Sequence, residues 1–379
     1  MNGVKILHVA DCHIGASRSF LQGHNVCGNT EIKDTFRKII EMCKKDAVDF
    51  LLISGDLFES PFPENEDVVE ICHLFSQISD TIVAIAPGNH DYACLGSVYL
   101  KHKFPENVII FSSFAEYYDF EDKNVRLSGA GFTDRFETLP LLSTFNSCDS
   151  NMINICVIHG DLTSESQVSN YNPITLNQIK NSGFDYLALG HIHKRTEILK
   201  AGNTFYAYPG CPDGTGFDED GSKGVYIGTV SKGFCDLKYK EFSSRMYLYE
   251  TFDITDCTST IQVTDEINRY LEEKYGDTYK NNIYRISLCG FLNPDFSLSL
   301  NRIKSILEES ITYCDLTDET EPDLDSVKKI AKEDSLRGIF AKNLLARLDS
   351  GSDDEIRIIR DALKIGLKAF EGEVKIGDH

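Results

Sequence analysis

Short apolar runs alternate with helical stretches through roughly the first 230 residues. Five of these runs are rich in β-forming residues, and each ends in Asp, Asn or His: VKILHVADCH, DFLLISGDLF, TIVAIAPGNHD, NMINICVIHGD and FDYLALGHIH. Between the first two, helical spacing joins Ile32, Phe36, Ile39, Ile40 and Cys43. Strands that are apolar on both faces and alternate with helices predict an α/β layered core.

The pattern changes after about residue 201, where short strands follow one another without helices. We interpret FYAYPG, KGVYIGTV and FCDLKYKEF as strands that complete a second sheet packed against the first. From about Arg245 a strand–helix–strand–helix order predicts a small α+β domain, and the remainder carries helical apolar stripes. The expected domains are residues 1–244, 245–325 and 326–379.

Composition and charge argue against two classes of protein, those that coat nucleic acid and those that span a membrane. The chain has 379 residues and a formal charge of −21, which argues against a protein that coats nucleic acid through a general basic surface. No apolar run approaches the ~20 residues that cross a bilayer, and the N-terminal residues enter a strand without a signal-peptide pattern. We therefore expect a cytoplasmic protein that does not bind membranes, and carboxylates gathered in one cleft would suit cations.

Polar clusters follow the five strands: Asp11–His13, Gly55–Asp56, Gly88–Asp91, His159–Asp161 and Gly190–His193. Taken singly, each cluster is typical of a turn or a capped helix start. Taken together, they fall where ligands collect in α/β sheets, beyond the carboxyl ends of the strands. The set predicts a two-metal centre that clamps a phosphate, with Asp56 as the bridging carboxylate. Imidazole and carboxylate ligands favour Mn, Fe or Zn over Ca or Mg.

The pair His191 and His193 has a spacing that suits such a centre. In an extended segment, residues two apart point the same way, so both rings can face the cleft while Ile192 turns to the interior. We expect each ring to serve a different ion.

In this order, D-x-H, G-D, G-N-H-D, H-G-D and G-H-I-H resemble the motifs of the calcineurin-like metallophosphoesterases. The longer strings VADCHIG, ISGDLFES, APGNHD, LGHIH and YPGCPDGTGFDEDGSKG are similar to those of the SbcD-like and YhaO-like DNA repair exonucleases. The resemblance implies a two-sheet α/β/β/α sandwich with a smaller α+β capping domain and C-terminal helices. It also implies two divalent metal ions, with Mn ahead of Fe, Zn and Mg.

The resemblance also implies roles for single residues. It assigns one ion to Asp11, His13, Asp56 and His193, and the other to Asp56, Asn89, His159 and His191. His90 would face the phosphate as general acid or transition-state stabiliser, since an imidazole with a pKa near neutrality can protonate a leaving alkoxide.

Three further residues carry open alternatives. Some members of the family have a second histidine where this chain has Glu59, which either hydrogen-bonds His90 and holds it protonated or is a solvated loop acid. Arg18 either touches a substrate phosphate or is a solvated loop arginine. Lys194, directly after the histidine pair, is a candidate contact for a nucleic-acid backbone.

The leading interpretation is a metal-dependent DNA phosphodiesterase of the DNA repair type, in which two metal ions activate hydroxide for attack on phosphorus. The resemblance implies exonuclease activity, endonuclease action on hairpins or single strands, a homodimer, and an SbcC-like coiled-coil ATPase as partner. One alternative keeps the site but acts on small nucleotides, cyclic phosphodiesters or phosphoproteins, which the charge of −21 favours. The other is a non-catalytic metal-binding scaffold.

Overall fold

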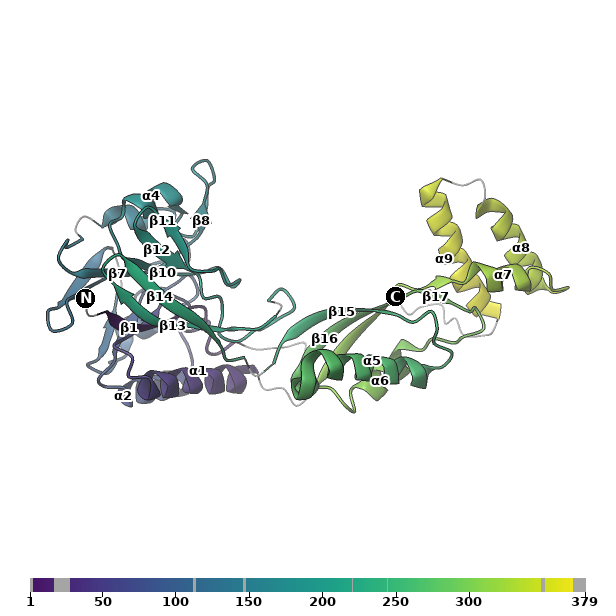
Figure 1. The fold of residues 1–379 in the computed structure, drawn as a ribbon, viewed down its shortest axis with the longest axis horizontal. Coiled ribbons are helices and arrows are strands. Elements are labelled where there is room, and N and C mark those ends of the chain that lie inside the picture. The colour runs from purple at the N-terminus through teal and green to yellow at the C-terminus, as the bar shows by residue number, and fades with distance from the viewer. Residues whose placement is uncertain are drawn as a thin grey trace. The chain divides into compact units, whose positions relative to one another are not determined.

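The computed structural model places the chain in two compact units, Met1–Met246 and Tyr247–His379 (Figure 1). It describes residues 3–16, 28–111, 114–145, 148–219, 221–243, 245–348 and 352–370. The observed division lies two residues from the boundary predicted after residue 244, and the division into three domains stays a prediction.

Two six-stranded sheets form the first unit. The first sheet contains, in spatial order, β14 (Phe234–Glu241), β13 (Gly224–Ser231), β1 (Val4–Val9), β2 (Phe50–Ile53), β3 (Ile82–Ile85) and β4 (Val108–Ile110). The second contains β11 (Leu199–Ala201), β12 (Thr204–Ala207), β10 (Tyr186–Gly190), β7 (Ile153–His159), β6 (Val125–Ala130) and β5 (Glu116–Phe120). The strands β1, β2, β3 and β4 are mutually parallel, as are β6, β7, β10 and β12. Their carboxyl ends therefore meet at common sheet edges.

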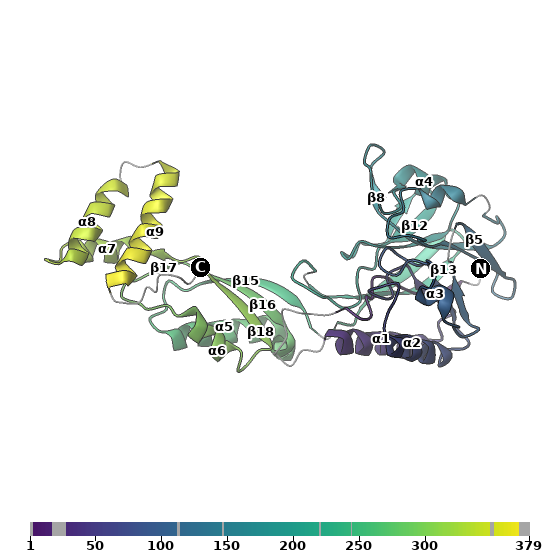
Figure 2. The same cartoon turned by 180° about the vertical axis from the view of Figure 1, so that it is seen from behind.

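Helices cover the outer faces of this unit. The helices of this unit are α1 (Gly28–Lys45), α2 (Asn65–Ser76), α3 (Val98–Lys101), α4 (Leu176–Asn181) and the 3₁₀ helix η2 (Leu141–Thr144). The unit also contains two short strands outside the large sheets, β8 (Leu162–Thr163) and β9 (Ile174–Thr175). Figures 1 and 2 show α1 and α2 on one outer face and α4 on the opposite one. The predicted stripe of α1 is buried, with Phe36 and Ile39 in its centre, and Lys44 and Lys45 complement the helix dipole in its last turn.

The apolar core of the first unit has three layers. One cluster joins α1 and α2 to the first sheet, a second lies between the sheets with Ile6 and Phe50 opposite Ile155 and Tyr186, and a third joins the second sheet to α4. These layers confirm the predicted α/β/β/α sandwich.

One detail of the predicted topology is wrong. Only β12, from FYAYPG, joins the second sheet, whereas β13 and β14 extend the first sheet, with β13 antiparallel to β1. The alternating pattern of these strands shows that each has a buried face, but it does not say which free sheet edge will pair with it. The open edge of β1 supplies that pairing through Val4 to His8.

The second unit has a parallel three-stranded sheet in the order β15 (Tyr247–Asp253), β16 (Ile283–Cys289) and β18 (Tyr313–Asp318). The helices α5 (Thr260–Tyr275) and α6 (Leu300–Leu307) pack on one face of this sheet, as Figures 1 and 2 show. The remaining elements are η3 (Gly276–Asn281), β17 (Phe291–Leu292), β19 (Glu321–Pro322), α7 (Leu324–Ile330), α8 (Leu336–Leu348) and α9 (Asp353–Phe370). The last three helices share a small apolar core of their own. Within the described residues, no helix combines the length and apolarity needed to span a membrane.

Candidate metal centre

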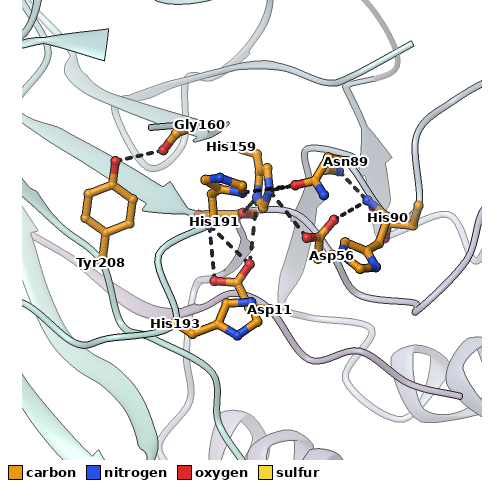
Figure 3. A network of polar contacts seen from close by, with 12 residues as sticks. Asp11, Asp56, Asn89, His90, His159, Gly160, His191, His193 and Tyr208 are labelled. Atoms are coloured by element: carbon orange, nitrogen blue, oxygen red, sulfur yellow. Dashed lines mark hydrogen bonds and ion pairs between the residues drawn. The ribbon is translucent and has the colours of Figure 1, made fainter. Parts of the chain in front are cut away.

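The seven predicted metal ligands come together at one end of the two sheets; Figure 3 shows six of them, and His13 lies against His193. They follow or close the parallel strands β1, β2, β3, β7 and β10, and the residues are Asp11, His13, Asp56, Asn89, His159, His191 and His193. Because both sheets direct the carboxyl ends of these strands to this edge, side chains from five distant segments converge.

The backbone at these strand ends is unusual. Asp11, His13 and Asp56 have φ angles of 53°, 49° and 49°, and His191 has a φ of 106°. Non-glycine residues rarely adopt positive φ, and such strain is concentrated at functional sites. Strand β10 ends at Gly190, so His191 and His193 do not point the same way through simple strand alternation. The turn at His191 directs the two rings instead, and Ile192 packs against the core beside the second sheet.

Two glycines allow the polar groups to approach one another. A Cβ on Gly55 would lie 2.1 Å from Nδ1 of His159, and a Cβ on Gly88 would lie 2.2 Å from a carboxylate oxygen of Asp56. Both distances are far shorter than any tolerable contact. The glycines of the G-D and G-N-H-D motifs are therefore required by the packing of the site itself.

His13 and His193 face each other across one part of the site. Nδ1 of His13 lies 2.8 Å from Oε2 of Glu59, and Nδ1 of His193 contacts Oε1 of Glu219. Because an ionised carboxylate can only accept, each Nδ1 carries the hydrogen, and in the neutral ring each Nε2 presents a lone pair. These two Nε2 atoms lie 3.2 Å apart. Two lone pairs at this distance repel, so the pair needs either a proton shared between the rings or a metal ion close to both.

His159 and His191 converge on Asn89 in the same way. Nδ1 of His159 donates to the Ser54 carbonyl at 2.8 Å, while its Nε2 lies 2.9 Å from Oδ1 of Asn89. Nε2 of His191 lies 3.2 Å from Asp161, which leaves Nδ1 to face the same Asn89 oxygen at 3.0 Å. Lone pairs of two neutral rings therefore point at an atom that is itself an acceptor.

Asp11 and Asp56 supply buried negative charge, each with an exposed fraction of 1%. Both oxygens of Asp11 accept the backbone N–H of His191 at 3.1 Å, and Oδ1 of Asp56 accepts that of His90 at 2.8 Å (Figure 3). Oδ2 of Asp56 lies 3.4 Å from Nε2 of His159. The carboxylates stand between the histidine pairs, as a shared ligand must.

The charges around His193 favour a cation. Burial alone would lower its pKa, but the hydrogen bond to Glu219 and the charges of Asp11, Glu219 and Asp56 raise the pKa to about 9. The pKa of His13 is also raised, because the hydrogen bond to Glu59 and the charges of Asp56 and Asp11 outweigh its burial. The converging lone pairs and this preference for positive charge fit divalent metal ions.

His90 stands at the edge of the site with 37% of its side chain exposed. Its Nδ1 lies 3.5 Å from Oε1 of Glu59, whose other oxygen contacts His13. The hydrogen bond to Glu59 and, against the effect of burial, the charge of Asp56 raise the pKa of His90 to about 9. The pKa of Glu59 falls to about 2, because its contacts with His13 and His90 outweigh its partial burial. Glu59 thus bridges two rings rather than lying free in solvent.

Three carboxylates that the sequence interpretation did not single out support this arrangement. Glu219 accepts from the backbone N–H of Thr215 at 2.6 Å and orients His193, and Asp161 orients His191. Asp91 is fully buried and accepts the backbone N–H groups of Gly88 and Phe58. Asp91 and Asp161 belong to the G-N-H-D and H-G-D motifs, so their position next to proposed ligands could have been predicted from the sequence. Glu219 lies within the string YPGCPDGTGFDEDGSKG, but nothing in the sequence singled it out among the acidic residues there.

Of the two predicted substrate contacts, Arg18 lies outside the described residues. Lys194 is exposed and lines a cavity beside His193. Its contact with substrate stays a prediction.

Comparison with known proteins places the chain in a family. The model of the calcineurin-like phosphoesterase family matches residues 4–195, which is half of the chain. Three similar relatives are the metallophosphoesterase YhaO of Bacillus subtilis, the DNA double-strand break repair protein Mre11 of Saccharolobus solfataricus and the D component of the nuclease SbcCD of Staphylococcus epidermidis.

YhaO is 28% identical over 63% of this chain, and the match spans only 60% of YhaO. Mre11 is 21% identical over 95% of this chain and 94% of its own length. The SbcCD component is 24% identical over 75% of this chain and 79% of its own length. With the family match over the strands and histidines described above, the protein belongs to the calcineurin-like phosphoesterase family of metal-dependent hydrolases.

Proposed function

We propose that the protein is a dinuclear-metal phosphodiesterase that cleaves DNA, a nuclease of the DNA repair type. The observation that carries the proposal is the convergence of four histidine lone pairs, two aspartates and Asn89 on one edge of the sheets. DNA as substrate is supported by the similarity to Mre11 and the SbcCD component, which extends into the second unit.

In this proposal one ion is held by Asp11, His13, Asp56 and His193, and the other by Asp56, Asn89, His159 and His191. When bound, the ions would neutralise phosphate charge and lower the pKa of water so that hydroxide is available near neutral pH. The mixed imidazole and carboxylate set favours manganese, with iron, zinc or magnesium as the other candidates.

His90 is the proposed general acid. Its Nδ1 faces Glu59, so Nε2 is the nitrogen free to donate a proton to the departing 3′ or 5′ oxygen of the substrate. Glu59 would hold the ring in orientation and stabilise its charged form. A neighbouring carboxylate does this without taking the proton itself.

The proposal extends to partners and setting. An SbcC-like ATPase, a homodimer and a cytoplasmic location follow from the resemblance to repair nucleases. A partner with a basic surface would compensate for the formal charge of −21, because a long polyanion is repelled by an acidic chain.

A second candidate is a phosphodiesterase or phosphatase acting on small nucleotides or phosphoproteins. The formal charge of −21 favours it, since a small substrate needs no extended basic surface. The similarity to YhaO is compatible with either substrate class.

One assay separates these candidates. Purified protein with Mn²⁺ is tested on labelled linear duplex, single-stranded and hairpin DNA, and on bis-p-nitrophenyl phosphate, with His90→Asn as control. Cleavage of DNA that His90→Asn abolishes supports the nuclease. Hydrolysis of the small diester without cleavage of any DNA, even with the partner ATPase added, contradicts it and favours the second candidate.

A further inference from the structure

A cavity of about 270 Å³ lies beside the metal centre, and His193 is one of its lining residues. Three of its lining residues are cationic, namely Lys194, Arg195 and Lys223, and two are acidic, namely Asp218 and Glu219. Glu219 is already engaged by His193 and Thr215. In a chain with a charge of −21, a cavity whose cationic lining residues outnumber the acidic ones stands out.

Lys223 is the central residue of this cavity. Only 6% of it is exposed, and its backbone is held by Phe242 and Ser243 at the start of β13. Over the described ranges of the chain, no hydrogen bond or ion pair engages its ammonium group. The charge of Lys223 acts on the Glu219 carboxylate through space, without a direct contact. An anion that entered the cavity would give the ammonium group a hydrogen-bonded partner.

Tyr239 gives an independent observation. Its hydroxyl is buried and has no hydrogen-bond partner among the residues that the structure describes. The guanidinium of Arg195 lies 4.4 Å from the centre of the same ring and 3.2 Å from Glu197. A buried hydroxyl without a partner, in a cavity that cationic side chains also line, can donate a hydrogen bond to a phosphate oxygen.

We propose that this cavity is a second phosphate subsite, which binds the phosphate of a nucleic-acid strand next to the one that is cleaved. The proposal rests on the proposed nuclease function. Nε2 of His193 faces His13 in the metal centre, and His193 also lines the cavity. The cavity and the metal centre are thus adjacent, as two consecutive phosphates of one strand require. A substrate with a single phosphate would leave the cavity empty, so the subsite selects polynucleotides.

The test uses the full-length protein and the anisotropy of a fluorescein-labelled single-stranded oligonucleotide across a salt series. Lys223→Met keeps the length of the side chain and removes its charge. We expect binding to weaken severalfold and the slope of log K against log salt to fall by about 1, as for the loss of one phosphate contact. Tyr239→Phe removes only a hydroxyl without a partner, so it should fold normally and still weaken binding. Lys240→Met, an exposed lysine one residue along β14, is the matched control and should bind as wild type does.

The results distinguish failure of the subsite from failure of the nuclease function. If Lys223→Met and Tyr239→Phe both fold, as judged by thermal melting, and bind with wild-type affinity, with an unchanged salt slope for Lys223→Met, the subsite is rejected while the nuclease function stands. If Lys223→Met does not fold, Tyr239→Phe alone decides. If wild-type protein hydrolyses bis-p-nitrophenyl phosphate but binds no oligonucleotide, the nuclease function and the subsite fail together.

Discussion

Two fully buried histidines touch the same serine and yet occupy opposite kinds of environment. Nε2 of His8 donates to the Ser54 hydroxyl at 2.9 Å, and Nδ1 accepts from the Tyr186 hydroxyl at 2.8 Å. Ser54 passes its own hydrogen to the Ala188 carbonyl. His159 donates from Nδ1 to the Ser54 carbonyl, but its Nε2 faces acceptors on Asn89 and Asp56.

This difference shows how a structural histidine is told from a metal ligand. Every polar atom of the neutral His8 ring has a complementary partner, so the ring completes the interface between the two sheets. Its burial lowers the pKa to about 3, which keeps the ring neutral. His159 is equally buried but is left with a lone pair among acceptors. Burial is common to both, and the polarity of the facing atoms separates them.

Replacing His159 should have the largest effect and tests whether this histidine binds metal. His159→Leu should lose one of two bound metal ions and all measurable hydrolysis of bis-p-nitrophenyl phosphate. The variant loses a repulsive contact but also the hydrogen bond to the Ser54 carbonyl, so without metal it should melt close to the metal-free wild type. Mn²⁺ should stabilise the wild type more than the variant, which can bind only the remaining ion. Metal content by mass spectrometry and melting with and without Mn²⁺ provide the check. A variant that keeps two ions would refute the assignment.

His90 differs from both buried rings because it is exposed and contacts a carboxylate. His90→Asn should retain both metal ions and lower kcat on a phosphodiester by about 10² to 10⁴-fold, the usual contribution of a general acid. Metal content and kcat are measured on the same preparation. A parallel loss of metal would instead make His90 a ligand.

Glu219 allows a finer test, because it acts on the metal centre only through His193. Glu219→Gln should weaken metal affinity by about 10 to 100-fold, as is common when the partner of a ligand is changed. Isothermal titration with Mn²⁺ measures the change. Asp236→Asn, an exposed carboxylate on β14, is the control and should leave affinity unaltered. Equal affinities for the two variants would show that Glu219 does not orient His193.

The convergence of the proposed metal ligands was predictable from the sequence because each follows an apolar run. Parallel strands bring their carboxyl ends to one edge of each sheet, and the packing of the two sheets places Asp11 and Asp56 beside His159. The layered core was predictable for the same reason, since helical and strand periods are local properties.

The parts that were not predictable depend on long-range folding. Glu219 lies 26 residues after His193 in a loop with no periodic pattern, and only tertiary structure brings the two together. The φ of 106° at His191 cannot be inferred from composition, so strand alternation gave a plausible outcome for the wrong physical reason. The pairing of β13 with β1 likewise depends on which sheet edge is still unpaired after the earlier strands have assembled, and the sequence does not show this.

The smallest effect concerns His8 and appears in stability, not in activity. Its folded pKa of about 3 lies below the ordinary value of 6.5, so the unfolded chain binds a proton that the folded chain refuses. The contribution of His8 to stability is therefore complete above pH 6.5 and is lost as the pH falls towards 3. At pH 5 this loss amounts to about 2 kcal/mol. Urea unfolding of metal-free protein at pH 7 and pH 5 measures it.

His8→Gln removes the titration while keeping a polar side chain between Ser54 and Tyr186. The variant should be less stable than wild type at pH 7, because its hydrogen bonds are poorer, by about 1 to 3 kcal/mol. The difference in stability between pH 7 and pH 5 should shrink by about 2 kcal/mol relative to wild type. An unchanged difference would mean that His8 takes up a proton in the folded state, and the contrast with His159 would then lose its basis.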